Sequence, residues 1–141
     1  MAIRYWLGVM HRENVRFGRE SGFAQASRDT REVFQGMGDA DGLVYYSPRT
    51  DFEGDPLKEF TAIGYLADGH VYQESGQAWR PWRRRVDFDR QAVETSIRPL
   101  VKLLEFSRDD PEWGYQLRRG LFEISRHDFD LIREQMRRPA L

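Results

Sequence analysis

The stretch Trp79-Arg80-Pro81-Trp82-Arg83-Arg84-Arg85-Val86-Asp87-Phe88 decides the fold of this chain, because it joins a dense aromatic and arginine cluster to a strand-like pattern. Pro81 has a fixed φ and no backbone donor, which favours an edge strand or the entry to a strand. From Trp82 onward, alternation with period two predicts a β-strand. One face of that strand carries Trp82, Arg84, Val86 and Phe88, and the other carries Arg83, Arg85 and Asp87.

Arg84 is the exception on the apolar face of this predicted strand. An unpaired buried charge is energetically costly, so its guanidinium needs an internal carboxylate, an internal carbonyl or a ligand. Two interpretations follow from the residues alone. The strand is either a solvated edge strand whose Arg84 extends its charged head into water, or part of a binding surface for a planar, electron-rich ligand.

Composition limits the class of protein. A chain of 141 residues favours a single domain, here residues 1–141, with enough length to bury a core. The absence of cysteine excludes disulfides, thiolate metal sites and cysteine nucleophiles. No apolar run is long enough to span a bilayer and no signal-peptide pattern is visible. We therefore expect a soluble, cytoplasmic, monomeric protein that makes no membrane contact.

Charge is balanced overall but clustered locally. The net charge is −1, and Lys58 and Lys102 are the only lysines among 22 basic residues. Arginines gather at positions 80–85 and again at Arg118-Arg119. A near-neutral chain with concentrated arginine favours a small phosphate-contacting patch over a broad, non-specific nucleic-acid surface.

Hydrophobic periodicity predicts several short strands. Alternating residues indicate strands over 3–10, 43–47, 60–66, 82–88 and 117–124, with a turn at Asp68-Gly69 after the third of them. Small residues over 20–26 predict a loop that presents Phe23 and Gln25.

Helices are predicted over 11–17 with Gly18 as its stop, over 30–34, over 97–106, and after Ser125. Phe129, Ile132 and Met136 form the inner stripe of the last helix. The expected fold class is α+β, a small curved β-barrel of about five or six strands flanked by short helices.

Several runs resemble the stand-alone bacterial EVE domain proteins. They are Tyr5-Trp6, Gly22-Phe23-Ala24-Gln25, Tyr45-Tyr46-Ser47-Pro48, the strand over 60–64, Pro81-Trp82-Arg83-Arg84-Arg85-Val86-Asp87-Phe88 and Arg118-Arg119-Gly120-Leu121-Phe122-Glu123-Ile124, in this order along nearly the whole chain. EVE domains belong to the PUA-like superfamily beside YTH and ASCH domains. The resemblance implies a PUA-like barrel that holds a flipped, often modified, nucleobase of DNA or RNA in an aromatic pocket.

Candidate ligand-binding residues combine the resemblance with base chemistry. A base needs an aromatic platform, hydrogen bonds on its edge, and cations for the flanking phosphate. The resemblance carries over Trp6, Phe23, Gln25, Tyr46, Ser47 and Trp82, and the arginines supply the positive charge. The expected ligand-binding set is Trp6, Phe23, Gln25, Tyr46, Ser47, Trp82, Arg83, Arg84, Arg118 and Arg119.

Catalytic signatures are missing from the sequence. His11, His70 and His127 lie far apart without metal-ligand spacing, and Ser21 does not sit in a nucleophile elbow. We therefore expect no enzyme activity, no catalytic residue, no metal and no cofactor. An enzyme acting on RNA or nucleotides, and a module whose aromatic groove binds a peptide, remain as alternatives.

Overall fold

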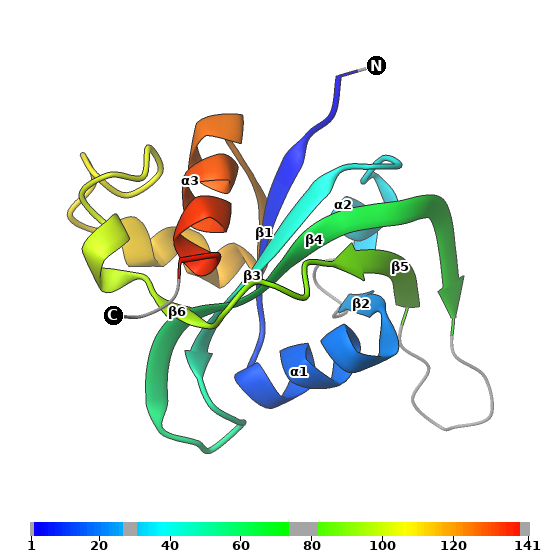
Figure 1. Ribbon diagram of the computed structural model, residues 1–141, viewed down its shortest axis with the longest axis horizontal. Helices are drawn as coiled ribbons and strands as arrows, with labels where there is room; N and C mark the ends of the chain where they lie inside the picture. The colour runs from blue at the N-terminus through cyan, green and yellow to red at the C-terminus, as the bar shows by residue number, and fades with distance from the viewer. Residues whose placement is uncertain (1, 27–30, 74–81, 139–141) are drawn as a thin grey trace.

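Seven strands form one mixed sheet in the computed structural model, which describes residues 2–26, 31–73 and 82–138. The sheet curls into a half-barrel with helices around it, as the α+β prediction requires (Figure 1). Its strands are β1 (Tyr5–Val9), β2 (Phe23–Ala26), β3 (Gly42–Arg49), β4 (Pro56–Gln73), β5 (Trp82–Phe88), β6 (Thr95–Ser96) and β7 (Leu121–Ile124). The helices are α1 (Arg12–Ser21), α2 (Arg31–Gln35) and α3 (Arg126–Met136), with 3-10 segments η2 (Arg98–Leu100) and η3 (Trp113–Arg119).

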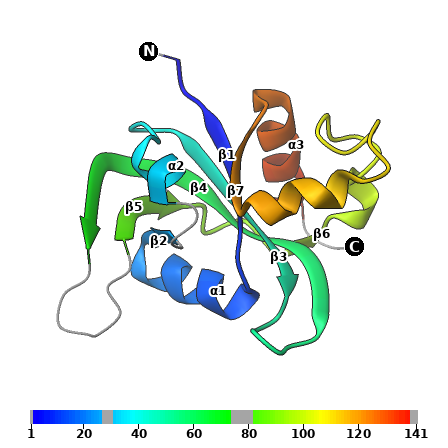
Figure 2. The same cartoon turned by 180° about the vertical axis from the view of Figure 1, so that it is seen from behind.

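The strand order is β2-β5-β4-β3-β1-β7, with the short β6 paired to β4. β1 runs parallel to β3, whereas the other pairs are antiparallel. Parallel neighbours need a long crossover, and α1, β2 and α2 supply it between β1 and β3. The crossover carries α2 next to β7, the strand at the opposite edge of the sheet from β2, as seen from behind in Figure 2.

Two hydrophobic cores lie on opposite faces of the sheet. The first contains residues of α3 and its strand partners, and the second contains residues of α1 and α2. β3 is buried on both faces and contributes to both cores, because successive side chains point in opposite directions. Val44 and Tyr46 enter the first core, whereas Leu43 and Tyr45 enter the second.

The C-terminal helix confirms its sequence prediction. The Ser125 hydroxyl accepts a hydrogen bond from the Asp128 backbone N–H at 3.1 Å, which caps the first turn of α3. Phe129, Ile132 and Met136 are completely buried, so the predicted apolar stripe faces the core. Tyr5 also packs on Phe129, with ring centroids 4.9 Å apart.

The predicted helix over 97–106 is wrong. That segment contains the single 3-10 turn η2 followed by turns. Single i to i−4 bonds form at Val101 and Leu104, but at the end of the segment the Asp128 carboxylate accepts the backbone N–H groups of Glu105 and Phe106 at 2.7 and 3.1 Å. Those two donors are therefore taken out of an i to i−4 ladder by a residue from α3.

The predicted boundaries around α1 are also corrected. The helix continues through Gly18 and ends at Ser21, and its C-cap Gly22 adopts φ of 80° in the left-handed region. An added Cβ on Gly18 would lie 2.6 Å from the Phe23 carbonyl oxygen, so this glycine permits close packing. The chain over 23–26 forms β2, an edge strand, and not the predicted loop.

Two strand predictions need correction. β4 continues through the predicted turn at Asp68-Gly69, with a register shift between Leu66 and Val71. The last strand starts at Leu121, because the segment that ends with Arg118 and Arg119 forms η3. The predicted strand over 82–88 is confirmed as β5, while Trp79, Arg80 and Pro81 lie outside the described residues.

Candidate functional site

A largely enclosed cavity of about 60 Å³ lies where β1, β2, α2, β3 and β7 meet. Gly8 helps to shape it, because an added Cβ at this position would lie 2.7 Å from Cε1 of Tyr45. Only glycine therefore lets the tyrosine ring approach β1 this closely. The wall consists of Gly8, Val9, Met10, Gln25, Phe34, Leu43, Tyr45, Gly120 and Leu121.

Two polar side chains, Gln25 and Tyr45, interrupt this otherwise apolar lining. Tyr45 is only 5% exposed, and burial raises the pKa of its hydroxyl far above the ordinary value. A hydrogen bond with the backbone of Gln25 opposes that rise without cancelling it. The Tyr45 hydroxyl therefore stays protonated at neutral pH and can act as donor or acceptor.

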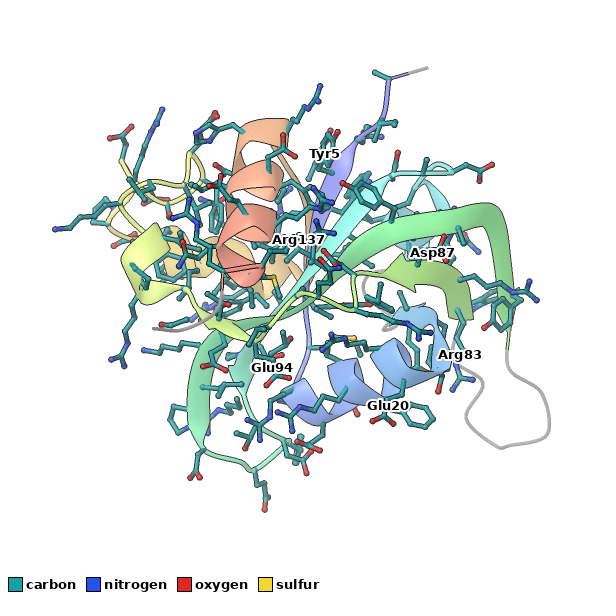
Figure 3. The ribbon with its side chains drawn as sticks, in the orientation of Figure 1. Tyr5, Glu20, Arg83, Asp87, Glu94 and Arg137 are labelled. Atoms are coloured by element: carbon teal, nitrogen blue, oxygen red, sulfur yellow. The ribbon has the colours of Figure 1, made fainter. Side chains whose placement is uncertain are left out.

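Gln25 connects the cavity to Arg83 on the neighbouring strand. The two residues face each other in the β2–β5 register, and Arg83 Nε donates to Gln25 Oε1 at 2.9 Å. The Arg83 guanidinium also lies over the Phe23 ring, with Cζ 4.0 Å from the ring centroid. Figure 3 shows Arg83 at this end of the sheet. These contacts join three expected ligand-binding residues into one cluster.

Phe23 is nearly buried beneath that guanidinium. It is 7% exposed and meets the ring of Phe17 edge-on, with centroids 5.6 Å apart. It lines a second, very small pocket beside the cavity, together with Met10, Gln25 and Tyr45. Trp82 stands opposite Ala26 at the end of the β2–β5 ladder, where it is partly buried against the second core.

Tyr46 and Ser47 are buried away from the described cavity lining. Tyr46 belongs to the first core, where its ring meets Phe60 edge-on at 5.8 Å, and burial raises its pKa to about 12. Ser47 is completely buried and its hydroxyl hydrogen-bonds to that of Thr61 at 2.8 Å. Both contacts are those of well-packed core residues.

Trp6 is buried by its contacts with Asp41 and Arg4. The indole Nε1 donates to the Asp41 carboxylate at 3.0 Å, and the Arg4 guanidinium covers the ring at 4.6 Å. Asp41 also accepts the backbone N–H groups of Arg4 and Gly38, at 3.0 and 2.8 Å. Trp6 thus helps to close the loop before β3.

Of the possible partners expected for the Arg84 guanidinium, the structure shows internal carbonyl groups. It is completely buried, and its guanidinium donates to the carbonyl oxygens of Phe34, at 3.4 Å, and of Met37. Phe34 lines the cavity, so Arg84 connects β5 to the segment that forms one cavity wall. These contacts show that Arg84 has a structural function.

Arg118 and Arg119 are exposed on η3, directly before the cavity residue Gly120. Arg118 lies over the Tyr115 ring at 4.5 Å and Arg119 over the Phe122 ring at 5.3 Å. Their positions place two cations next to Gly120 in sequence. Gly120 itself adopts φ of 73° and ends η3.

Several cavity residues were missed by sequence reasoning. Tyr45 lies on the face of β3 opposite Tyr46, and alternation alone does not reveal which face of a doubly buried strand borders a cavity. Gly8, Phe34 and Gly120 give no sequence signal, because they meet only through the crossover and the β1–β7 pairing.

Two larger grooves are open and dominated by charge. One, of about 1050 Å³, contains three arginines and the acids Glu20, Asp87 and Glu94, and Arg16 in it makes a salt bridge with Glu94 at 2.7 Å (Figure 3). The other, of about 640 Å³, lies between α3 and the tyrosines Tyr5 and Tyr65. Neither groove offers the apolar enclosure that a flat ring prefers.

One group of potential metal ligands is present among the described residues. Donor atoms of Glu105, His127 and Asp128 lie within 4.8 Å of one another. His127 Nδ1 contacts Glu105 at 3.1 Å and Asp128 at 3.0 Å, and the Asp128 carboxylate already holds the two backbone donors described above. The existing hydrogen bonds account for this arrangement as a structural link between α3 and the turn before it.

A curled mixed sheet flanked by helices on both faces defines an α+β domain. The family model for the EVE domain matches residues 4–135, and the chain belongs to the EVE domain family. The UPF0310 protein of Renibacterium salmoninarum is 44% identical over 131 residues, covering 92% of this chain and 93% of that protein. The UPF0310 protein YdcG of Bacillus subtilis is 33% identical, covering 96% and 94%.

Solved structures agree on the fold. The NMR structure of Rpa0253 from Rhodopseudomonas palustris superposes with a TM-score of 0.59 at 16% identity, covering 95% of this chain and 93% of that one. A hypothetical protein from Leishmania major gives a TM-score of 0.57 at 13% identity, covering 93% and 92%. Within the described residues, no helix has both the length and the apolar character needed to span a bilayer.

Proposed function

We propose that this member of the EVE family, whose domains typically bind nucleic acids, holds a flipped and modified nucleobase in the cavity between Gln25, Tyr45 and Phe34. The observation that carries the proposal is the lining itself: apolar walls interrupted by one amide and one protonated phenol. That is the combination a base requires, because its faces are apolar and its edge needs hydrogen bonds.

The walls supply van der Waals contact to the faces of the base. Phe34 and Tyr45 contribute aromatic rings, and Leu43 and Leu121 contribute aliphatic surface. A modification such as a methyl group adds apolar surface, which such walls accommodate favourably. Stacking and burial together offset the few kcal/mol that extruding a base from a strand costs.

Entry of a base requires a wall to move. A cavity of about 60 Å³ has room for a few water molecules, which is less than a whole base occupies. Met10 lines both this cavity and the small pocket beside it, and its side chain is unbranched and adaptable. We propose that Met10 swings aside when the base enters, so that the two spaces join.

Phosphate contacts come from exposed arginines around the cavity. Arg118 and Arg119 precede Gly120 on η3, and Arg85 is exposed on β5. Guanidinium groups donate in the fork geometry that phosphate oxygens accept. Few such cations are available, so the expected binding is weak to moderate and falls with salt.

The proposal describes a binding domain and not an enzyme. The polar side chains in the described cavity lining are an amide and a tyrosine that burial keeps protonated. Neither is a strong nucleophile or a general base near neutral pH. The partner is a DNA or RNA strand that carries a modified base.

Fluorescence anisotropy with labelled strands tests the proposal. The panel contains single strands and duplexes of DNA and RNA, about ten nucleotides long, each with one central base that is methylated or unmodified. We expect at least one modified strand to bind more tightly than its unmodified counterpart, and we expect Leu121→Trp, which fills the cavity, to remove that preference. Equal affinity for every strand, or binding only of peptides, would contradict the proposal.

A further inference from the structure

The hydrogen bond between Arg83 and Gln25 determines which end of an amide is available to a ligand. A guanidinium has only donors, so the amide atom that faces Arg83 Nε at 2.9 Å must be the carbonyl oxygen. This assignment follows from hydrogen-bond chemistry and does not depend on distinguishing the oxygen from the nitrogen of the amide. The NH2 end of Gln25 has no acceptor among the described residues.

The position of Arg83 is itself constrained. Its guanidinium lies 4.0 Å from the centroid of the Phe23 ring, and the β2–β5 register places Gln25 directly opposite Arg83. The Phe23 ring is held in turn by Phe17, which packs edge-on against it. The stacked, planar guanidinium is therefore held beside Gln25. Of the two ends of the Gln25 amide, it can donate to the oxygen end and not to the NH2 end.

We infer that Arg83 is a positioning residue that turns the NH2 group of Gln25 toward the ligand cavity, so that the site selects bases presenting a hydrogen-bond acceptor on the entering edge. This inference rests on the proposed function, because it assigns a role to Arg83 within the same cavity. Suitable acceptors are a ring carbonyl oxygen or an unprotonated ring nitrogen. A base edge that offers an N–H group at this point meets a donor instead of an acceptor and leaves both groups unsatisfied.

Arg83 is half-buried on the polar face of β5, a position from which it would otherwise be expected to contact phosphate. A phosphate contact acts on any strand and contributes to salt dependence, whereas orientation of Gln25 acts on base selectivity and contributes none. The two roles therefore differ in measurable ways.

A double-mutant cycle separates the two roles. Arg83→Met keeps a long side chain without donors, and Gln25→Ala removes the amide. If Arg83 acts through Gln25, Arg83→Met weakens binding of the tightest strand by about three- to tenfold in the parent and has no further effect in Gln25→Ala. The slope of log K against log salt stays unchanged.

A second variant reverses the polarity of the site without changing its size. Gln25→Glu retains an oxygen for Arg83 and places an acceptor where the NH2 group was. We expect this variant to melt no lower than the parent and to bind the tightest strand at least about tenfold more weakly. Arg83→Lys keeps the positive charge but loses the planar group, so it does not restore full affinity.

The outcomes are distinguishable. Three results would show a phosphate contact and overturn the inference while the proposed function stands. They are additive losses of affinity in the cycle, a salt slope lowered by about 0.7 in Arg83→Met, or full strand affinity of Arg83→Lys. A parent that binds no strand would contradict the proposed function, and the inference with it. In the free protein, we expect the side-chain amide NMR signals of Gln25 to shift in Arg83→Met and stay in place in Arg85→Met; equal shifts would also overturn it.

Discussion

The Arg83 guanidinium covers the face of the Phe23 ring, with Cζ 4.0 Å from the centroid. Phe23 was expected to be an open platform for a base, and the contact shows that in this state its face is occupied by a residue of the same protein. The ring therefore packs against Arg83 beside Gln25, and the aromatic residues that line the cavity are Phe34 and Tyr45.

Replacement of Gly8 tests the shape of the cavity. Gly8→Ala places a methyl group 2.7 Å from Cε1 of Tyr45, so the ring or the strand must shift. We expect a loss of about 1–3 kcal/mol in the free energy of unfolding, measured by urea denaturation, and weaker ligand binding. Gly114→Ala is the matched control, because an added Cβ there meets nothing within 4 Å. Equal stability of the two variants would contradict the described packing.

Replacement of Arg84 tests the link between β5 and the cavity wall. Arg84→Met removes the donors to the carbonyls of Phe34 and Met37 and leaves these oxygens buried. The expected destabilisation is about 1–3 kcal/mol for each carbonyl left without a partner. Arg85→Met, on the exposed face of the same strand, is expected to stay within about 0.5 kcal/mol of the parent. A melting temperature unchanged in Arg84→Met would argue against a structural role.

Acid should remove one specific contribution to stability. Burial raises the pKa of Asp89, but the hydrogen bonds from Arg137, at 2.5 Å, and from the Gln91 backbone, with the nearby charges, outweigh it and leave the pKa below its ordinary value. A lowered carboxyl pKa stabilises the fold above the unfolded pKa of about 4, and this stabilisation disappears as the pH falls through the folded value. Asp89→Asn should therefore be less stable than the parent at about pH 7 and approach it in acid. A difference that persists undiminished in acid would show that the contact is not electrostatic.

Salt dependence tests the exposed arginines. Arg118→Ala and Arg119→Ala should each reduce the slope of log K against log salt by about 0.7 for a single strand, if each contacts one phosphate. Arg126→Ala is a suitable control, because Arg126 lies on α3 away from the cavity. If Arg126→Ala changes the salt slope as much as Arg118→Ala does, the nucleic acid also contacts α3, which would contradict binding at the cavity.

Local patterns predicted the elements that local interactions determine. The Ser125 cap and the stripe of Phe129, Ile132 and Met136 lie within one helix, and the alternation over 82–88 lies within one strand. The helix predicted over 97–106 does not continue to its predicted end, where Asp128, more than twenty residues away in the chain, takes the backbone donors of Glu105 and Phe106. Propensity contains no information on such a distant competitor.

The site was predicted less completely than the fold. Gln25, Phe23 and Arg83 were expected near a ligand and do cluster, but their mutual hydrogen bond and stacking depend on the β2–β5 register, which the predicted loop over 20–26 did not contain. Tyr46 was expected at the site from the family resemblance, and alternation could not favour Tyr45 instead, because β3 is buried on both faces.

The central claim is that the cavity beside Gln25 receives the base. An NMR titration of the ¹⁵N-labelled protein with its tightest-binding strand tests this directly, because backbone amide shifts report where a ligand binds. We predict that the largest changes fall on Gly8, Gln25 and Gly120, which line the cavity. Changes centred on Tyr65, Arg133 and Arg137, in the groove along α3, with the cavity amides unmoved, would contradict the account.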